Sequence, residues 1–419
     1  MADLHDDDFP YDGPSPAVAP IPANAFPISD EAPPWLGEGV IGEPHRPAPP
    51  LKATPFTWRA EAEIPPRRWL YGRHLLRKFV SVDVAAGGIG KSSVKIGEAL
   101  AMASGKALYG KEVHGGPLTV WLYNLEDPAE ETERRLHATA KWFKLEAAEV
   151  EHRLFVDSGR DQRCIIATDT EAGTRIVMPV VEQIKAEIHL NEIDVLIIDP
   201  FVSSHEVSEN DNRAIDAVAK TWGQIADDCD CAVNLVHHVR KGNGAEATAE
   251  SARGAKALVD AARSVIVYNR MSEDEAGLAG VAQDQRGFYF RTINDKANLA
   301  PPGRADWFRM NNVDLANGDK VGVACPWTWP ELFDGISTAK ARAVQRAVAE
   351  GKWRKDPRSP DWVGHVVAQT VGMDVEKDRK RISAILKEWV KNGVLVEFED
   401  HDQKGNVRRF VKEGKWIVD

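Results

Sequence analysis

Residues 85 to 92 read Ala-Ala-Gly-Gly-Ile-Gly-Lys-Ser. An apolar stretch at 79–84 comes directly before them, and a helical pattern at 93–102 follows. A glycine loop between a strand and a helix is the setting that a phosphate-binding P-loop requires. Its glycines let backbone N–H groups close around a polyphosphate, and the start of the helix adds unpaired N–H groups and a positive dipole end. The sequence therefore predicts a nucleotide site at this loop.

The residues of the loop have separate expected roles at that site. Lys91 is expected to reach the β- and γ-phosphates of ATP, and the Ser92 hydroxyl is expected to hold Mg²⁺. Ala85 stands where this motif usually has its first glycine, and alanine is tolerated there if its φ is negative. The nucleotide contacts are predicted to come from Gly87, Gly88, Ile89, Gly90, Lys91, Ser92 and Ser93.

A second anchor for the metal is expected at 193–199, which read Ile-Asp-Val-Leu-Ile-Ile-Asp. An almost unbroken apolar run suits a strand that is buried on both faces of a parallel sheet. Asp199 ends this run at the carboxyl end of the strand, where open α/β sheets bind their ligands. We therefore predict that Asp199 is the Walker B aspartate, which binds Mg²⁺ through a water.

Other polar residues follow neighbouring predicted strands. Glu126 and Asp127 come after one strand, and His237 and His238 close another. Carboxyl ends of parallel strands converge, so these side chains are expected to meet at the nucleotide. Hydrolysis of a γ-phosphate needs a carboxylate that orients the attacking water, and Glu126 is the first choice, with Asp127 as the competing candidate. The histidines are expected to sense the γ-phosphate by hydrogen bonding.

The composition is that of a globular protein without a targeting segment. The chain has 419 residues and a net charge of −11, and its length allows two domains and a tail. It has no apolar stretch of membrane-spanning length, and its start is acidic, unlike a signal peptide. We therefore expect a cytoplasmic protein that has no membrane partner. The four cysteines have neither zinc spacing nor a disulfide pattern, and they are expected to be packing residues.

Shifts in composition divide the chain into three regions. Residues 1–57 hold 13 of the 25 prolines and several acidic residues, so a disordered tail is predicted there. Residues 58–330 alternate apolar strands with helical patterns, which predicts an α/β domain with a parallel sheet. Its strands are expected at 79–84, 118–124, 154–157, 195–198, 232–236 and 265–268, with an antiparallel edge strand at 288–292. Residues 337–419 are expected to form a separate small domain.

The C-terminal region has the pattern of a winged helix. Helices are expected at 338–350, 362–370 and 375–391, followed by a hairpin of strands 394–399 and 407–411. This region has 18 Lys and Arg residues against 13 Asp and Glu residues, although the whole chain is acidic. Contact with duplex or forked DNA is therefore predicted, with Lys377, Lys380, Arg381 and Arg408 as candidate DNA-binding residues. Winged helices also dock proteins, and that alternative stays open.

Five segments, read together, resemble one family. VDVAAGGIGKSS, WLYNLEDP, IDVLIIDPFVSSHEVSENDN, AVNLVHHVRKG and SARGAKALVDAARSV occur in this order between residues 82 and 265. Together they are similar to the RepA-like ATPases of plasmids, phages and mobile elements, whose best-known member is a hexameric replicative helicase. The resemblance implies a RecA-like core, ATP and Mg²⁺ as cofactors, and a ring-shaped homo-oligomer. It further implies single-stranded DNA in the channel of the ring.

The same resemblance implies roles for individual residues. Lys91 and Ser92 match the Walker A pair, Glu126 the catalytic glutamate and Asp199 the Walker B aspartate. His237 and His238 match the histidine motif that links nucleotide state to DNA contact, and His238 is the one expected to take part in catalysis. Arg263 matches the arginine finger that reaches the ATP of the neighbouring subunit, and Arg253 is the second candidate. The basic loop after the histidines, with Arg240 and Lys241, suits DNA backbone contact, although a solvated loop looks the same.

Three functions fit these features. The first is a DNA-stimulated ATPase that acts as a replicative helicase. The second is an ATPase that loads or recruits another helicase without translocating itself, and the third is a DNA-binding switch that ATP controls. A primase or an initiator protein is a candidate partner in each case.

Overall fold

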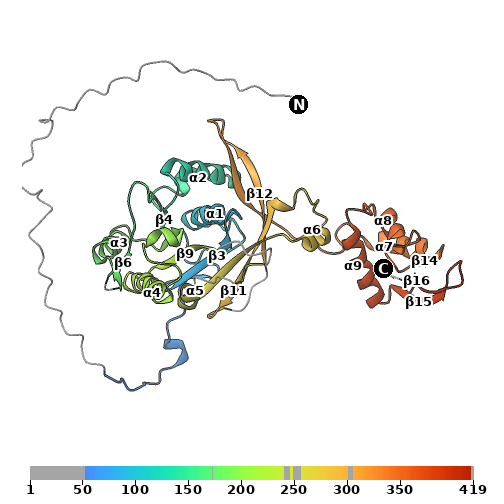
Figure 1. Cartoon of the computed structure of the whole chain (residues 1–419), viewed down its shortest axis with the longest axis horizontal. Helices are drawn as coiled ribbons and strands as arrows, with labels where there is room; N and C mark the ends of the chain where they lie inside the picture. The colour runs from blue at the N-terminus through green and yellow to red at the C-terminus, as the bar shows by residue number, and fades with distance from the viewer. Residues whose placement is uncertain (1–51, 172, 240–245, 249–255, 301–304, 417–419) are drawn as a thin grey trace, which may run out of the picture. The chain divides into compact units, whose positions relative to one another are not determined.

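The computed structural model describes residues 52–171, 173–239, 246–248, 256–300 and 305–416 (Figure 1). By its internal contacts the chain divides into two units, Met1–Pro65 and Pro66–Asp419. The described part of the first unit contains a short 3-10 helix, η1 (Glu61–Glu63). The predicted tail at 1–57 lies outside the described residues except for 52–57. The predicted boundary at 330–337 falls inside the second unit and remains a prediction.

A nine-stranded sheet, in the order β13-β12-β11-β10-β3-β9-β8-β4-β5, lies at the centre of the second unit. Its parallel part contains β3 (Val80–Ala86), β4 (Val120–Asn124), β5 (Leu154–Ser158), β8 (Val195–Asp199), β9 (Ala232–Val239) and β10 (Ser264–Arg270). The strand before the P-loop, β3, and the strand that ends in Asp199, β8, are separated by β9. Because these six strands run in one direction, their carboxyl ends meet at one edge of the sheet.

Three antiparallel strands extend the sheet beyond β10: β11 (Tyr289–Ala297), β12 (Asp306–Asp314) and β13 (Lys320–Trp327). The sequence predicts a parallel sheet with a single antiparallel edge strand at 288–292, and this prediction is wrong in two respects. The sheet is mixed, and β11 lies between β10 and β12, away from the edge. Strand β12 is hard to recognise in the sequence because only Phe308 and Val313 of its nine residues are buried, so its apolar alternation is weak.

Helices cover both faces of the sheet (Figure 1). On one face lie α1 (Lys91–Ser104) and α2 (Ala129–Phe143), and on the other lie α3 (Met178–Leu190), α4 (Asn212–Asp228) and α5 (Lys256–Ala261). Successive residues of β8 pack alternately into these two layers, Val195 and Ile197 toward α1, Leu196 and Ile198 toward α4. A strand buried on both faces therefore reads as a continuous apolar run.

Shorter elements connect this framework. They are β1 (Trp69–Tyr71), β2 (Leu75–Leu76), η2 (Ala147–Glu149), β6 (Ala167–Thr170), β7 (Gly173–Ile176), η3 (Phe201–Ser204), α6 (Glu273–Ala279) and η4 (Arg286–Phe288). Four of these strands form two-stranded antiparallel sheets of their own, β1 with β2 and β6 with β7. Among the described helices, none is long and apolar enough to span a membrane.

A buried ionic cluster holds α1 against the sheet. Lys95 of α1 lies 2.7 Å from a carboxylate oxygen of Asp83 on β3 and 2.7 Å from one of Glu98. Asn234 of β9 and Tyr268 of β10 donate hydrogen bonds to the two oxygens of Asp83, at 2.7 and 2.6 Å. Burial opposes the ionisation of Glu98, but neighbouring lysines outweigh it and hold its pKa well below the usual range. The cluster therefore fixes the helix that begins at the P-loop to three strands.

The C-terminal part of the second unit contains three helices and a three-stranded antiparallel sheet. The chain order is α7 (Thr338–Ala349), β14 (Trp353–Arg354), α8 (Val363–Val371), α9 (Arg379–Lys391), β15 (Leu395–His401) and β16 (Val407–Glu413). The strands pair in the order β14-β16-β15. The predicted helix at 375–391 begins four residues later, because the Asp374 side chain accepts the backbone N–H groups of Glu376 and Lys377 and forms a turn there. Strand β14 is not predicted from the sequence.

Candidate nucleotide site

The P-loop has a conformation that its glycines make accessible. Gly88 has a φ of 75° and Gly90 a φ of 120°, values that side-chain-bearing residues rarely adopt. A Cβ added to Gly90 would also lie 3.2 Å from the Phe290 ring and from the sulfur of Met310. Ala85 is buried in β3 and is not among the described residues with positive φ. Alanine therefore meets the condition under which it can replace the usual first glycine.

The anchoring and exposed parts of the loop differ. Ile89 is buried against Val94 and Tyr268, so its side chain holds the loop on the core. Gly87 and Gly88 are exposed, and a Cβ on Gly87 would meet nothing within 4 Å. The open side of the loop therefore has room for a ligand over its backbone N–H groups.

Lys91 is held in the loop by weak neutral partners. Its ammonium lies 3.0 Å from the carbonyl oxygen of Ala85 and 3.2 Å from Nδ1 of His238, and the residue is 3% exposed. Burial lowers the pKa of Lys91 to about 8, although the carboxylates of Asp199, Asp83 and Glu126 act in the opposite direction. A buried cation that has neutral partners is poised to bind an anion.

Ser92 and Asp199 lie together at the carboxyl ends of β3 and β8. Burial raises the pKa of Asp199, and a hydrogen bond with the Ser92 side chain partly offsets that effect. The hydroxyl and the carboxylate are therefore placed as a pair, as a Mg²⁺ site needs. Ser93 differs from its expected role. Its hydroxyl accepts the backbone N–H of Ala324 at 2.8 Å, so the side chain serves the contact of α1 with β13 and leaves only its backbone for the nucleotide.

The structure distinguishes Glu126 from Asp127. The Asp127 carboxylate accepts a bond from Arg135 at 2.7 Å and one from the Asn124 amide at 3.2 Å. The Glu126 carboxylate is exposed, and its one hydrogen bond among the described residues comes from the Ser203 hydroxyl at 3.5 Å. Asn124 Oδ1 accepts the backbone N–H groups of both acidic residues, at 3.0 and 2.8 Å. The turn is thus rigid, while Glu126 keeps a carboxylate that is available to orient a water.

The two histidines of β9 have different environments. The contact of His238 Nδ1 with Lys91 joins β9 to the P-loop. Burial, followed by the charge of Lys91, lowers the pKa of His238, so the neutral ring can accept from the ammonium. His237 is 5% exposed and packs its ring against Phe201. Burial lowers its pKa to about 4. His238 therefore faces the loop, whereas His237 belongs to the core beneath it.

Arg270 contacts the P-loop, and it is not among the residues predicted from the sequence. Its guanidinium donates to the carbonyl oxygens of Gly88, at 2.5 Å, and Gly287, at 2.9 Å. The residue closes β10, which pairs directly with the P-loop strand β3. The rule that ligand-binding residues follow the carboxyl ends of adjacent strands would have pointed to it.

Arg263 lies at the other end of the sheet. Its backbone N–H donates to Val80 O at the start of β3, and its guanidinium carbon lies 5.9 Å from the centre of the Phe79 ring. The length of β3, about 20 Å for seven residues, separates it from the P-loop of its own chain. Arg263 is exposed, so a role as a finger requires the nucleotide of another subunit. The other predicted residues of this segment, Arg240, Lys241 and Arg253, lie outside the described residues.

The basic residues predicted in the C-terminal region have different fates. Arg381 donates to the backbone carbonyls of Leu332 and Asp334, and Lys380 pairs with Asp274. Lys377 is exposed, and its ammonium has no ion-pair partner within the described ranges. Arg408 is half-exposed and lies 3.5 Å from Asp402. The structure therefore uses Lys380 and Arg381 for internal contacts and leaves Lys377 and Arg408 facing solvent.

These features fit a Mg²⁺–nucleotide at the carboxyl ends of β3, β4, β8 and β9. The open backbone of Gly87 and the cation of Lys91 suit phosphates, and Ser92 with Asp199 suits the metal. Mg²⁺–ATP would bring a γ-phosphoryl group with its charge partly neutralised. Glu126 and His238 flank the position of that group from β4 and β9.

Comparison with known proteins supports this conclusion. A family model described as an AAA domain matches residues 44–244, the segment that carries the P-loop, Glu126, Asp199 and both histidines. Among solved structures, the chain is similar to the ATPase domain of a helicase, with 14% identity, 56% of this chain and 82% of that chain covered, and a TM-score of 0.38. The RadB recombinase is similar at 12% identity, with 56% and 88% covered and a TM-score of 0.36. The family match and the geometry of the loop together support an α/β P-loop ATPase.

Proposed function

We propose that this protein is an ATP-hydrolysing DNA motor with a RecA-like core, most specifically a ring-forming replicative helicase that moves along single-stranded DNA. The observation that carries the proposal is the convergence of Lys91, Glu126, Asp199 and His238 at one edge of the sheet. The separation of β3 from β8 by β9 also supports a RecA-like core. Each residue has a defined task in this proposal.

The catalytic task belongs to Glu126. Its free carboxylate accepts a proton from the attacking water, while the turn held by Asn124 keeps it in place. Lys91 stabilises negative charge on the phosphates and exchanges its contact with His238 for them. His238 then loses a partner when nucleotide is present and regains it afterwards. This exchange would transmit the nucleotide state along β9 to the basic segment that follows it.

Arg263 is proposed to complete the site of a neighbouring subunit. It is exposed and is far from its own P-loop, so it can stabilise transition-state charge only in trans. Mixing Arg263→Ala protein with Lys91→Ala protein tests this assignment. Some interfaces of mixed rings would join an intact P-loop to an intact finger, and partial ATPase activity should return. No recovery at any mixing ratio, with mixed rings verified by mass, would count against a trans finger.

The C-terminal region is proposed to be a winged helix that contacts DNA. The order helix-strand-helix-helix-hairpin, with the short strand β14 paired to the hairpin strand β16, supports this assignment. Its proposed task is to recruit the motor to duplex or forked DNA. Protein docking by the same region is the competing assignment.

The deciding experiment measures the ATPase rate with and without single-stranded DNA, together with the mass of the oligomer. The proposal expects a ring-sized oligomer whose turnover rises with single-stranded DNA and which displaces a strand from a fork. Stimulated turnover without strand displacement would favour a loader. Slow, unstimulated turnover with sequence-specific duplex binding would favour an ATP-controlled switch.

A further inference from the structure

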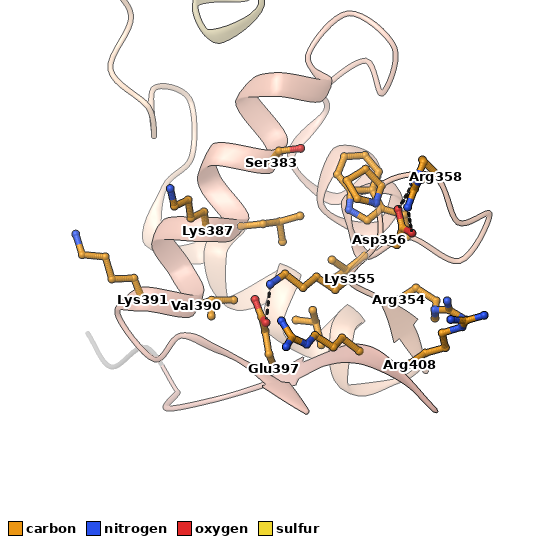
Figure 2. A pocket seen from close by; sticks show the side chains of 16 residues that line it. Arg354, Lys355, Asp356, Arg358, Ser383, Lys387, Val390, Lys391, Glu397 and Arg408 are labelled. Carbon is orange, nitrogen blue, oxygen red and sulfur yellow. Dashed lines mark hydrogen bonds and ion pairs between the residues drawn. The ribbon is translucent and has the colours of Figure 1, made fainter. Parts of the chain in front are cut away.

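A groove crosses the C-terminal part of the chain between α9 and the sheet β14-β16-β15. It has a volume of about 870 Å³. One wall is a stripe of α9, where Ser383, Lys387 and Lys391 follow one another at intervals of four residues. The other wall comes from β14, β16 and the turn after β14. Figure 2 shows Lys387 and Lys391 on the helix side, with Arg354 and Arg408 on the strand side.

The lining of the groove is strongly basic. Of its sixteen residues, seven are Lys or Arg and two are acidic: the basic ones are Arg354, Lys355, Arg358, Lys387, Lys391, Arg408 and Arg409. These charges come from segments that are separate in the sequence, and the fold gathers them on one surface. A concentrated positive surface on an acidic chain marks a site for a polyanion.

Most of these cations keep unused hydrogen-bonding capacity. Lys387 has no ion-pair partner in the part of the chain that the structure describes, and it is exposed. The Lys391–Glu388 and Arg409–Glu399 pairs span 3.4 and 3.7 Å, and their basic side chains are 72% and 64% exposed. Such solvated pairs contribute little and are easily exchanged for another anion. At the other end of α9, by contrast, Arg381 is bound to backbone carbonyls.

The floor of the groove offers little apolar surface to a ligand. Trp362, Val363 and Val411 are 1–3% exposed, and Leu386 is 8% exposed. A docked peptide obtains much of its affinity from apolar anchors in open pockets. A phosphate backbone needs cations instead. The groove therefore fits a nucleic-acid strand better than an acidic peptide.

We propose that this groove holds one sugar–phosphate strand of duplex DNA, with α9 on one side of the strand and the β15–β16 hairpin on the other. A major groove about 12 Å wide admits an α-helix, so the strand that borders it passes between the helix and the hairpin. The proposal rests on the DNA motor proposed above, because it locates the duplex contact of that motor. It replaces the start of α9 by its second half as the DNA-binding part.

The test measures duplex binding by the full-length protein as a function of salt. A Lys387→Ala, Lys391→Ala double variant is expected to bind a random-sequence duplex about tenfold more weakly, and the slope of log affinity against log salt should fall by about two. The matching Arg double variant should retain most of the affinity because it keeps both charges. Lys377→Ala removes an equally exposed cation of the same region that lies outside the groove, and its duplex affinity should equal that of the wild type.

Two results would overturn the proposal. One is wild-type duplex affinity in the Lys387→Ala, Lys391→Ala variant, with a loss in Lys377→Ala. The other is unchanged duplex binding while a synthetic acidic peptide of residues 3–12, Asp-Leu-His-Asp-Asp-Asp-Phe-Pro-Tyr-Asp, loses its affinity for the double variant. The DNA motor itself is tested separately, by stimulation of wild-type ATPase with single-stranded DNA. Failure of the groove and failure of the motor therefore give different results.

Discussion

The nucleotide edge of the sheet and the basic groove both present cations for phosphates, but they hold them differently. Lys91 is 3% exposed and is fixed by a carbonyl and an imidazole. Lys391, in the groove, is 72% exposed at its side chain. A buried group acts through one fixed geometry in a medium of low dielectric constant. An exposed group acts through its share of a summed charge that salt screens.

This difference predicts how each region responds to substitution. At the nucleotide edge, removal of one side chain should eliminate a function or a large part of the stability. In the groove, each substitution should cost a modest, salt-dependent fraction of affinity. Substitutions of Lys91 and Lys95 test the first half of this contrast, and the duplex experiment tests the second.

The largest effect is expected from Lys91→Ala. The substitution removes the cation that would contact the β- and γ-phosphates, so turnover should fall by about a thousandfold or more and ATP binding should weaken. Steady-state ATPase assays and equilibrium nucleotide binding measure the two effects. Lys220→Ala, which removes an exposed lysine paired with Asp216 on α4, is the control. Comparable activity in Lys91→Ala and this control would remove Lys91 from the site.

The next effect concerns stability. Lys95→Met leaves Asp83 and Glu98 buried without their shared cation, and the free energy of unfolding should fall by about 3–5 kcal/mol. Urea unfolding of the full chain measures it. Lys220→Ala, which breaks a solvated pair, should change the same quantity by no more than about 0.5 kcal/mol. Equal stability of the two variants would show that the cluster does not anchor α1.

The smallest effect is a pH dependence of ATP affinity. Burial lowers the pKa of Lys91 to about 8 in the nucleotide-free chain, and phosphates favour the protonated form. Binding must therefore take up a proton wherever the free lysine is neutral. Affinity should be steady below pH 7 with respect to this group and fall about tenfold from pH 7 to pH 9. The pKa of His238 is lowered, so its ring stays neutral in this range.

Isothermal titration of ATP at pH 7, 8 and 9 measures this dependence. The residual binding of Lys91→Ala should be flat over the same range, because the titrating group is absent. A wild-type affinity that is flat, or that rises with pH, would contradict the assignment of the shifted pKa to Lys91.

How far sequence alone predicted these features depends on where the interacting residues lie in the chain. The P-loop, Asp199 and His238 were predictable because each lies next to the strand or helix that positions it. Parallel strands buried on both faces also give apolar runs that are easily recognised. The weakly amphipathic strands β12 and β13 give no such pattern, so the extension of the sheet was missed.

Side-chain partners that are distant in the sequence were the second source of error. The Ser93 hydroxyl contacts Ala324 across 231 residues, and Arg135 engages Asp127 from within α2. Neither contact can be inferred from local spacing. The groove needs β14, α9 and β16 together, whereas the sequence pattern emphasised the basic start of α9.

Glu126, and not its neighbour Asp127, is expected to activate the attacking water. One comparison decides between them: ATP binding and ATP turnover of Glu126→Gln and Asp127→Asn, side by side with the wild type. We predict that Glu126→Gln binds ATP but hydrolyses it at least about a hundredfold more slowly, while Asp127→Asn, which weakens the contact with Arg135, retains most of its turnover. Normal hydrolysis by Glu126→Gln, with loss in Asp127→Asn, would contradict this assignment.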